Sequence, residues 1–295
     1  MTFTPYAQPS PQAGQKDEPS LPVPIEETAA AAGGRNLYVM GGFDAVGNSL
    51  DSTYVFDGTS WHSGPRLPLP LDHPSAATLD GKVYLAGGHS NGRDSARVFR
   101  LDADHWTELA PMHYARGGHS LVAAQGRLYA VGGNTTRINV PQVESYDPAA
   151  NAWSVITSLP DPRNHLMGFV QQGSICVAGG RSPTTSRVDC FDGSSWSSLP
   201  ALPQPTSGGG AATFSGGDVV VTGGQDASET RIVNQLARWS GRAWTDESML
   251  HPRHGFELAI YEGRAWACGG GSAPGLHPVA TCTSLGDTAA SYRGK

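Results

Sequence analysis

Short apolar segments recur along the whole chain, and six of them end in a glycine doublet. They are separated by polar turns such as LDGK, AQGR and YEGR, and none approaches the length of a membrane span. This pattern predicts short strands joined by tight turns. The doublet segments are LYVMGG (37–42), VYLAGG (83–88), LYAVGG (128–133), ICVAGG (175–180), VVVTGG (219–224) and AWACGG (265–270).

The six doublets mark an internal repeat. Successive doublets lie 46, 45, 47, 44 and 46 residues apart, and the features around them follow one order. A proline-rich corner precedes a strand of small residues, the doublet strand follows, and a third strand leads to a tryptophan in five of the units. Four strands at this period are typical of one blade of a β-propeller, which must pack against neighbouring blades to bury its faces.

This arrangement resembles the Kelch repeat, and the resemblance covers nearly the whole chain. It implies an all-β, six-bladed Kelch-type propeller, here without the BTB and BACK domains of Kelch adaptors. The sixth unit lacks its last strand, whereas QKDEPSLPVP (15–24) aligns with WHSGPRLPLP (61–70) at an offset of 46. We therefore expect an N-terminal strand to complete the last blade and close the ring, which hides two strand edges.

The alignment predicts a single domain between two tails. Gln15 stands where Trp61 stands in the first unit, so we expect the closing strand to be held less tightly. The expected ranges are 1–14 for the first tail, 15–286 for the propeller, 15–24 for its closing strand, 25–70, 71–115, 116–161, 162–205, 206–251 and 252–286 for the blades, and 287–295 for the second tail.

Composition mainly excludes classes of function. The net charge of −6 and the lack of a basic stripe argue against nucleic-acid binding. The N-terminus has neither the basic start nor the apolar core of a secretory signal. We therefore expect a cytoplasmic protein that contacts neither nucleic acid nor membrane, with reduced, buried thiols. The four thiols form two pairs, each spaced by fourteen residues: Cys176 with Cys190 and Cys268 with Cys282.

One face of the ring is expected to collect the polar residues. Because neighbouring strands are antiparallel, the loop entering strand 1 of each blade and the loop leaving strand 2 lie on the same face, at the mouth of the central channel. Counting back sixteen residues from each doublet identifies the entrances. The entrances contribute Glu26, Glu27, Asp72, His73, Arg116, Arg163, Asn164, His165, Arg253 and His254, and the loops after the doublets contribute His89, Asn134, Arg181 and Gln225.

These side chains predict a site for a small polar or anionic ligand. Arginine offers a planar pair of donors that suits a carboxylate or phosphate. The Kelch resemblance implies that Arg116, Arg163 and Arg253 contact the ligand. Further binding contacts are expected from Asn164, His254, Arg181, His89, Glu26, Asn134 and Gln225.

A cofactor-free enzyme is one alternative, of the isomerase, epimerase or cyclase type. Acid–base catalysis would then fall to His165, His73, Glu27 and Asp72, with an arginine anchoring the substrate. The bacterial sialic-acid mutarotase, a six-bladed Kelch ring, uses a pocket carboxylate and an arginine. The resemblance in fold and charge assigns those parts to Glu26 or Glu27 with Arg253.

A partner protein is the second alternative, although only Phe43 and Tyr114 offer aromatic side chains on the loops of this face. A metal site is not expected. His73, His165 and His254 fall on alternate blades, but His254 is one position out of step with the other two. No cofactor is expected either.

Overall fold

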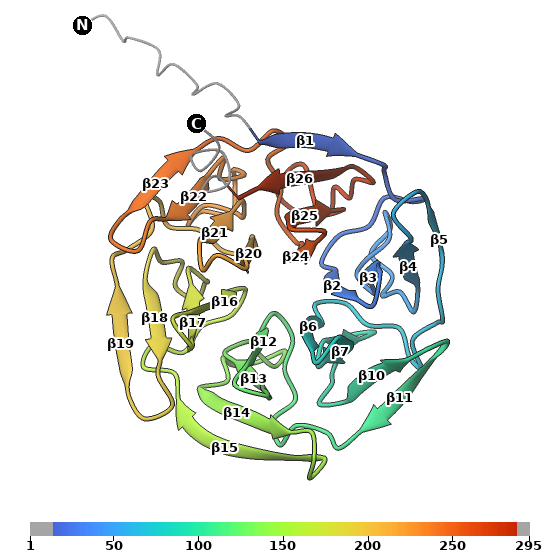
Figure 1. Ribbon diagram of the computed structural model, residues 1–295, viewed down its shortest axis with the longest axis horizontal. Helices are drawn as coiled ribbons and strands as arrows, with labels where there is room; N and C mark the ends of the chain where they lie inside the picture. Colours follow the sequence, from blue (N-terminus) through green and yellow to red (C-terminus); the bar gives the residue numbers. More distant parts are fainter. Residues whose placement is uncertain (1–13, 288–295) are drawn as a thin grey trace, which may run out of the picture.

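The computed structural model describes residues 14–287 as six four-stranded antiparallel sheets arranged like blades around a central channel (Figure 1). This is the all-β, six-bladed propeller that the repeats predict. The described residues contain no helix, and therefore none that spans a membrane. Apart from Gly14 and Asp287, the two predicted tails lie outside the described residues.

The strands follow one order in each blade, from the channel outwards. Blade 1 contains β2 (Ala29–Gly33), β3 (Asn36–Met40), β4 (Thr53–Phe56) and β5 (Trp61–Ser63). Blade 2 contains β6 (Ser75–Leu79), β7 (Lys82–Ala86), β10 (Val98–Asp102) and β11 (His105–Leu109), with β8 (His89–Ser90) and β9 (Arg93–Asp94) between β7 and β10. Blade 3 contains β12 (Ser120–Ala124), β13 (Arg127–Val131), β14 (Gln142–Asp147) and β15 (Ala152–Ser158).

The second half of the ring repeats this order. Blade 4 contains β16 (Met167–Gln171), β17 (Ser174–Ala178), β18 (Val188–Phe191) and β19 (Trp196–Leu199). Blade 5 contains β20 (Gly210–Thr213), β21 (Val219–Thr222), β22 (Leu236–Trp239) and β23 (Trp244–Glu247). Blade 6 contains β24 (Leu258–Tyr261), β25 (Arg264–Cys268), β26 (Cys282–Gly286) and, on its outer edge, β1 (Gln15–Glu18).

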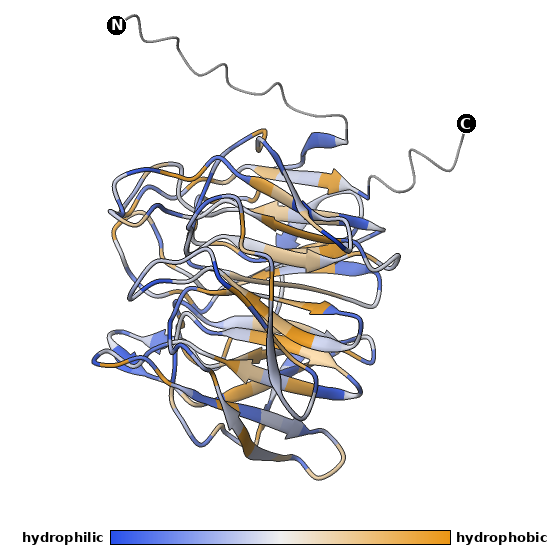
Figure 2. Cartoon of the chain, turned by 90° about the vertical axis from the view of Figure 1, so that its left-hand side faces the viewer, coloured by the Kyte–Doolittle hydropathy of each residue, from blue (hydrophilic) through white to orange (hydrophobic). Residues whose placement is uncertain are grey.

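The hydrophobic core lies between blades. Each of six buried clusters draws on two neighbouring blades; Met40 of blade 1, for example, belongs to one cluster with Phe99 and Trp106 of blade 2. Figure 2 shows the apolar residues concentrated in the strands and the hydrophilic ones in the connecting loops. A fully buried side chain of this size stabilises the fold by about 1.5–3 kcal/mol, so each blade depends on its neighbours.

The repeated tryptophans link adjacent blades through their indole N–H groups. Trp61 donates to the carbonyl oxygen of Pro19 at 2.7 Å, Trp153 to that of Ala110 at 3.0 Å and Trp244 to that of Pro200 at 2.8 Å. Each acceptor lies in the corner that ends the preceding blade. Each ring also packs against a core cluster between two blades, so one side chain provides both an apolar and a polar contact.

The N-terminal strand closes the ring as predicted. β1 pairs with β26 in the register Gln15↔Leu285 to Glu18↔Cys282. Gln15, which replaces the tryptophan, donates from Nε2 to the Ser248 carbonyl oxygen at 2.7 Å and accepts from the Leu250 N–H at 2.8 Å. The closing strand thus keeps a hydrogen-bonded link to the preceding blade in place of the missing indole.

The expectation of reduced thiols is wrong. Cys176 and Cys190 form one disulfide, and Cys268 and Cys282 form another. The members of each pair are direct partners on adjacent strands, with Cα–Cα distances of 4.0 and 4.1 Å. Disulfides persist mainly in oxidising compartments, so the four cysteines do not support the predicted cytoplasmic location.

Candidate functional site

Six equivalent residues, one per blade, form a closed circle of backbone hydrogen bonds around the channel axis. Each N–H donates to the carbonyl oxygen of the equivalent residue in the preceding blade, with N–O distances between 2.6 and 3.1 Å. This circle surrounds the axis at the mouth of the channel. We call it the inner ring, and its members are Glu27, His73, Gly118, His165, Gly208 and Gly255.

The inner ring imposes a left-handed backbone on all six members, with φ between 52° and 72°. Glycine adopts this conformation readily, and three blades use it. Glu27, His73 and His165 adopt it as non-glycine residues, at a conformational cost of order 1 kcal/mol each. Residues held in such conformations cluster at functional sites, which makes these three side chains the first candidates for a function.

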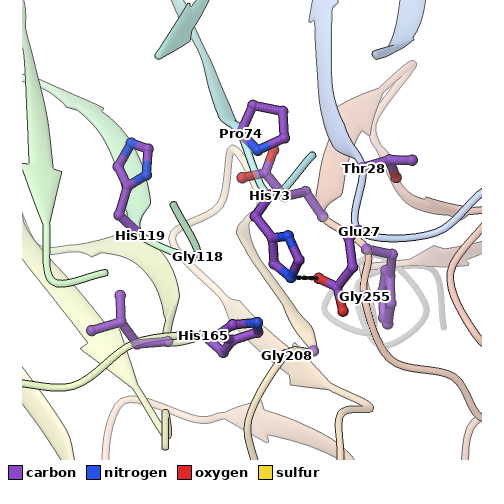
Figure 3. Close-up of a pocket in the computed structure, with 13 residues that line it drawn as sticks. Glu27, Thr28, His73, Pro74, Gly118, His119, His165, Gly208 and Gly255 are labelled. Atoms are coloured by element: carbon purple, nitrogen blue, oxygen red, sulfur yellow. Dashed lines mark ion pairs between the residues drawn. The ribbon is translucent and has the colours of Figure 1, made fainter. Parts of the chain in front are cut away.

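Two of these side chains form an ion pair at the axis. His73 Nε2 lies 3.4 Å from Glu27 Oε2, and the two groups face each other in Figure 3. The other ring nitrogen of His73, Nδ1, lies 2.7 Å from Asp72 Oδ1. Asp72 in turn accepts a hydrogen bond from Ser49. The imidazole is therefore held between two carboxylates.

His165 is held differently. Its Nδ1 lies 2.6 Å from Asn164 Oδ1, and its Nε2 lies 3.0 Å from Arg181 Nη2. Because a guanidinium only donates, Nε2 accepts and Nδ1 carries the proton that is donated to Asn164. Arg181 also forms an ion pair with Glu229 at 2.8 Å.

These surroundings separate the charge states of the three side chains. Burial alone would raise the pKa of Glu27, but the charge of His73 and a hydrogen bond from His254 outweigh it and hold that pKa well below its usual range. Burial would lower the pKa of His73, but Glu27 and Asp72 raise it. Burial, and then the positive charge of Arg181, hold the pKa of His165 well below its usual range.

A cavity of about 50 Å³ lies on the axis beside the inner ring. A site for one water needs about 10–15 Å³, so this cavity has room for several waters. Its wall also includes His119, which is buried and whose two ring nitrogens lack a hydrogen-bond partner within residues 14–287. The cavity is thus lined by polar groups that call for a polar occupant.

Glu257 is a buried carboxyl group of the cavity wall that the sequence did not single out. It accepts hydrogen bonds from the Ser75 hydroxyl at 2.5 Å and from the N–H groups of Ala30 and Ala76 at 2.9 and 3.1 Å. Burial nevertheless raises the pKa of Glu257 to about 7.

Glu257→Gln is expected to remove a pH-dependent loss of stability. The pKa of Glu257 in the folded protein, about 7, exceeds the usual 4.5. Between these pH values the folded protein holds a proton on Glu257 that the unfolded chain does not, so the free energy of unfolding falls as the pH rises from 4.5 through 7. The loss is about 3 kcal/mol in the wild type. Urea unfolding at pH 5 and pH 8 measures it, and comparison with the variant cancels the titration of Glu27, His73, His119 and His165. A wild-type-minus-variant difference that does not change with pH would contradict the assignment.

Three arginines expected to contact the ligand are buried instead. Arg116, Arg163 and Arg253 expose 0%, 0% and 1% of their surface. Each donates to the carbonyl oxygen of the first glycine of its own blade's doublet, at 3.0, 2.6 and 2.8 Å respectively. Arg116 also pairs with Glu144 at 2.8 Å. Their guanidinium groups hold the blade together, and we do not retain them in the proposed site.

The remaining candidates lie in two further circles around the inner ring. In each blade, the residue preceding the inner-ring member forms a bridge with the residue following the doublet, which places both sets on the same face as expected. Of the first set, His254 Nδ1 lies 3.6 Å from Glu27 Oε1. The bridges are Glu26–Phe43, Asp72–His89, Gly117–Asn134, Asn164–Arg181, Ser207–Gln225 and His254–Gly271.

Arginines further along the loops of this face were missed by the sequence reasoning. Arg93 and Arg137 are exposed and follow the doublets of blades 2 and 3, and Arg231 is exposed on the corresponding loop of blade 5. With Arg181 of blade 4, they make an arginine rim on four consecutive blades. Extending the search by a few residues past each doublet would have found them.

Comparisons with known proteins agree with this architecture. Residues 12–180 match the family model described as the KLHDC2/KLHL20/DRC7 Kelch-repeats domain. Kelch-like protein 35 of Mus musculus is 37% identical over 117 residues, covering 39% of this chain and 20% of that protein. Kelch-like protein terF of Aspergillus terreus is 27% identical over 292 residues, covering 87% of this chain and 63% of that protein. The matches therefore span less than two thirds of these relatives' lengths. The structure of YjhT superposes with a TM-score of 0.78 at 17% identity, covering 92% of this chain and 97% of that one.

Proposed function

We propose that this chain, which belongs to the Kelch-repeat family of β-propellers, binds a small polar or anionic ligand at the channel mouth. The observation that carries the proposal is the convergence of Arg181, His165 and Asn164 at one point of the mouth, beside the inner ring. Because all six blades meet at the inner ring, a ligand bound there contacts several blades at once.

The size of the axial cavity supports a position for the ligand outside the inner ring. At about 50 Å³ the cavity takes only part of a metabolite, so the rest of the ligand contacts the loops that follow the doublets. Arg181 exposes about a quarter of its side chain there, and Asn134, Gln225 and His89 lie on the same circle. Within the arginine rim, Arg181 and Arg231 pair with Glu229 and Asp226. The arginines provide donors for a carboxylate or phosphate group on the ligand, which would compete with those carboxylates.

The test is isothermal titration calorimetry with hits from a thermal-shift panel of sugar acids, sugar phosphates and dicarboxylates. Arg181→Gln is expected to weaken binding by at least about tenfold, because one charged hydrogen bond contributes about 1.5–3 kcal/mol. The matched control is Arg127→Gln, which removes a similar ion pair with Asp147 at 2.8 Å on the opposite face. Equal loss in both variants, or none in Arg181→Gln, would refute a site at the mouth.

A peptide segment of a partner protein is a second candidate ligand. It is favoured by three exposed apolar side chains on loops around the mouth: Val46, Ile138 and Leu276, exposed by 79%, 68% and 37%. Apolar contacts of this kind add little to the binding of a small anion but suit a peptide backbone with side chains. Serine substitutions at Val46 and Ile138 that abolish binding would favour the peptide, and unchanged affinity would favour the small anion.

Acid–base catalysis by His165, His73, Glu27 and Asp72 stays a prediction. Its support is their assembly at the axis, where His73 lies within 3.4 Å of Glu27 and its ring centroid 5.1 Å from that of His165. Conversion of a bound ligand, followed by product analysis, separates this function from simple binding.

A further inference from the structure

The inner ring brings together three side chains of the types that bind transition metals. One ligand atom from each of Glu27, His73 and His165 lies within 4.8 Å of the other two. A tetrahedral ion with bonds of about 2.1 Å needs donor atoms about 3.4 Å apart. His73 Nε2 and Glu27 Oε2 are already 3.4 Å apart, so the imidazole of His165 has to approach and Arg181 has to leave its Nε2.

The second ring nitrogens of both histidines are already fixed. His73 Nδ1 is bonded to Asp72 Oδ1 at 2.7 Å, and His165 Nδ1 to Asn164 Oδ1 at 2.6 Å. In metal sites the non-ligating nitrogen of a histidine almost always donates to a carboxylate or carbonyl oxygen, which fixes the ring and leaves Nε2 for the ion. Each inner-ring histidine obtains this partner from the residue that precedes it in the chain.

Backbone conformation gives an independent reason to assign a role to these three residues. Glycine occupies the other three positions of the ring, where φ is also positive. The fold therefore does not require a side chain at this position, and a joint role for Glu27, His73 and His165 is consistent with their positive φ.

The unpartnered imidazole of His119 points to an occupant of the adjoining cavity. His119 is 4% exposed, lines the same cavity as the three inner-ring side chains, and has no hydrogen-bond partner at either nitrogen among the described residues. Water bound to an ion at the inner ring would lie in this cavity, within a volume of about 50 Å³.

We propose that Glu27, His73 and His165 bind one divalent transition-metal ion, of the zinc or iron(II) class, on the channel axis. Two imidazoles and one carboxylate favour these ions over magnesium or calcium, which prefer oxygen ligands. Three protein ligands leave open positions for water or for an oxygen atom of a ligand in the mouth. The inference goes beyond the proposed function, because it depends on the inner ring alone.

Arg181 competes with the ion in this site. Its Nη2 donates to His165 Nε2 at 3.0 Å, the nitrogen that the metal requires, and its charge opposes that of the ion. Metal binding therefore displaces Arg181, whose other contacts, to Glu229 and Asn164, lie further out in the mouth. Arg181→Met should strengthen metal binding while it weakens anion binding, so the two proposals fail independently.

The experiment is calorimetric titration of the chelator-treated protein with Zn²⁺, with Mg²⁺ as the control ion, and with Co²⁺ absorption to report the coordination. We expect one zinc per chain and no magnesium binding. His73→Gly and His165→Gly should each weaken zinc binding by at least about 100-fold, because each removes one of three ligands. Both variants should fold, since glycine is what three blades carry at this position.

The control variant is His105→Gln, which changes an exposed histidine on β11, the outermost strand of blade 2, outside the ligand set and outside the mouth. It should bind zinc as tightly as the wild type. Without metal, the circular dichroism spectra of the two glycine variants should match that of the wild type, which shows that the lost zinc affinity does not come from unfolding. Zinc affinity that is the same in the wild type and both glycine variants, or no zinc binding below 100-fold molar excess, would overturn the proposal.

Discussion

Replacing Arg116 by methionine is expected to lower the free energy of unfolding by about 3–5 kcal/mol. Arg116 and Glu144 expose none of their side-chain surface, and their ion pair is 2.8 Å long. Without the guanidinium, Glu144 remains as a buried carboxylate with only the neutral N–H groups of His113 and Tyr114 and the half-exposed His113 ring beside it. The carbonyl oxygens of Gly132 and Gln142 also lose their donor. Urea unfolding at pH 7 measures the loss.

Two controls separate the buried charge from general damage. Arg97→Met removes an exposed arginine whose partner Glu108 is also exposed, and it should cost less than about 1 kcal/mol. Adding Glu144→Gln to Arg116→Met removes the isolated charge and should recover part of the loss. A single variant no less stable than the surface control would show that the buried pair contributes little, and that a ligand role for Arg116 deserves to be reopened.

The same position shows why the sequence suggested a different role. Arginine occupies it in blades 3, 4 and 6, whereas Ile25 and Leu71, both buried, occupy it in blades 1 and 2. Equivalent positions that carry arginine in some blades and a buried apolar residue in others indicate an interior position. The residue following it, by contrast, is polar in most blades. The distance to the doublet placed the arginines at the strand entrance, but only the folded structure shows that their side chains turn inwards and donate to the doublet carbonyl oxygens.

The inner ring was predictable in part. The entrance register placed Glu27, His73 and His165 at the mouth, since each stands at a fixed distance before its doublet. Their meeting at the axis depends on backbone hydrogen bonds between blades, which carry no sequence signal. In blade 5, counting back sixteen residues from the doublet places Ser207 at the position of Arg116, which is one residue too late. The Gly180 N–H donates to the Thr206 carbonyl oxygen, as the Gly88 N–H donates to that of Arg116. The turn between β20 and β21 is longer here: it spans 214–218, where blade 2 uses two residues.

Ring closure was more predictable than the buried arginines or the inner ring. The last repeat lacks its fourth strand, and the segment before the first repeat supplies one. The disulfides were not, since a spacing of fourteen residues only becomes informative once Cys176 and Cys190 are known to face each other across two strands. Repetition thus specifies which strands pair, whereas side-chain partners depend on geometry that differs from blade to blade.

Deletion of residues 1–24 is expected to lower the melting temperature by about 10 °C or more. It removes β1 from the edge of β26, the buried Leu21 from the cluster between blades 6 and 1, and the acceptor of the Trp61 indole at Pro19. Burying Leu21 alone is worth about 1.5–3 kcal/mol. The lost ladder and inter-blade bonds bring the total to about 4 kcal/mol, and each kcal/mol shifts the melting temperature of a domain this large by about 2–4 °C.

The matched comparison is a chain that lacks only residues 1–13 and so keeps β1, measured by differential scanning calorimetry beside the longer deletion. The difference between the two isolates the closing segment. Leu21→Ala should reproduce part of the loss, and Val23→Ala, at a residue that is 39% exposed, should not. The longer deletion should also aggregate more readily, because it leaves the backbone groups of Cys282–Gly286 as an open strand edge. Equal melting temperatures for the two deletions would mean that the ring is held by the contacts between blades alone, and that β1 covers an edge without stabilising it.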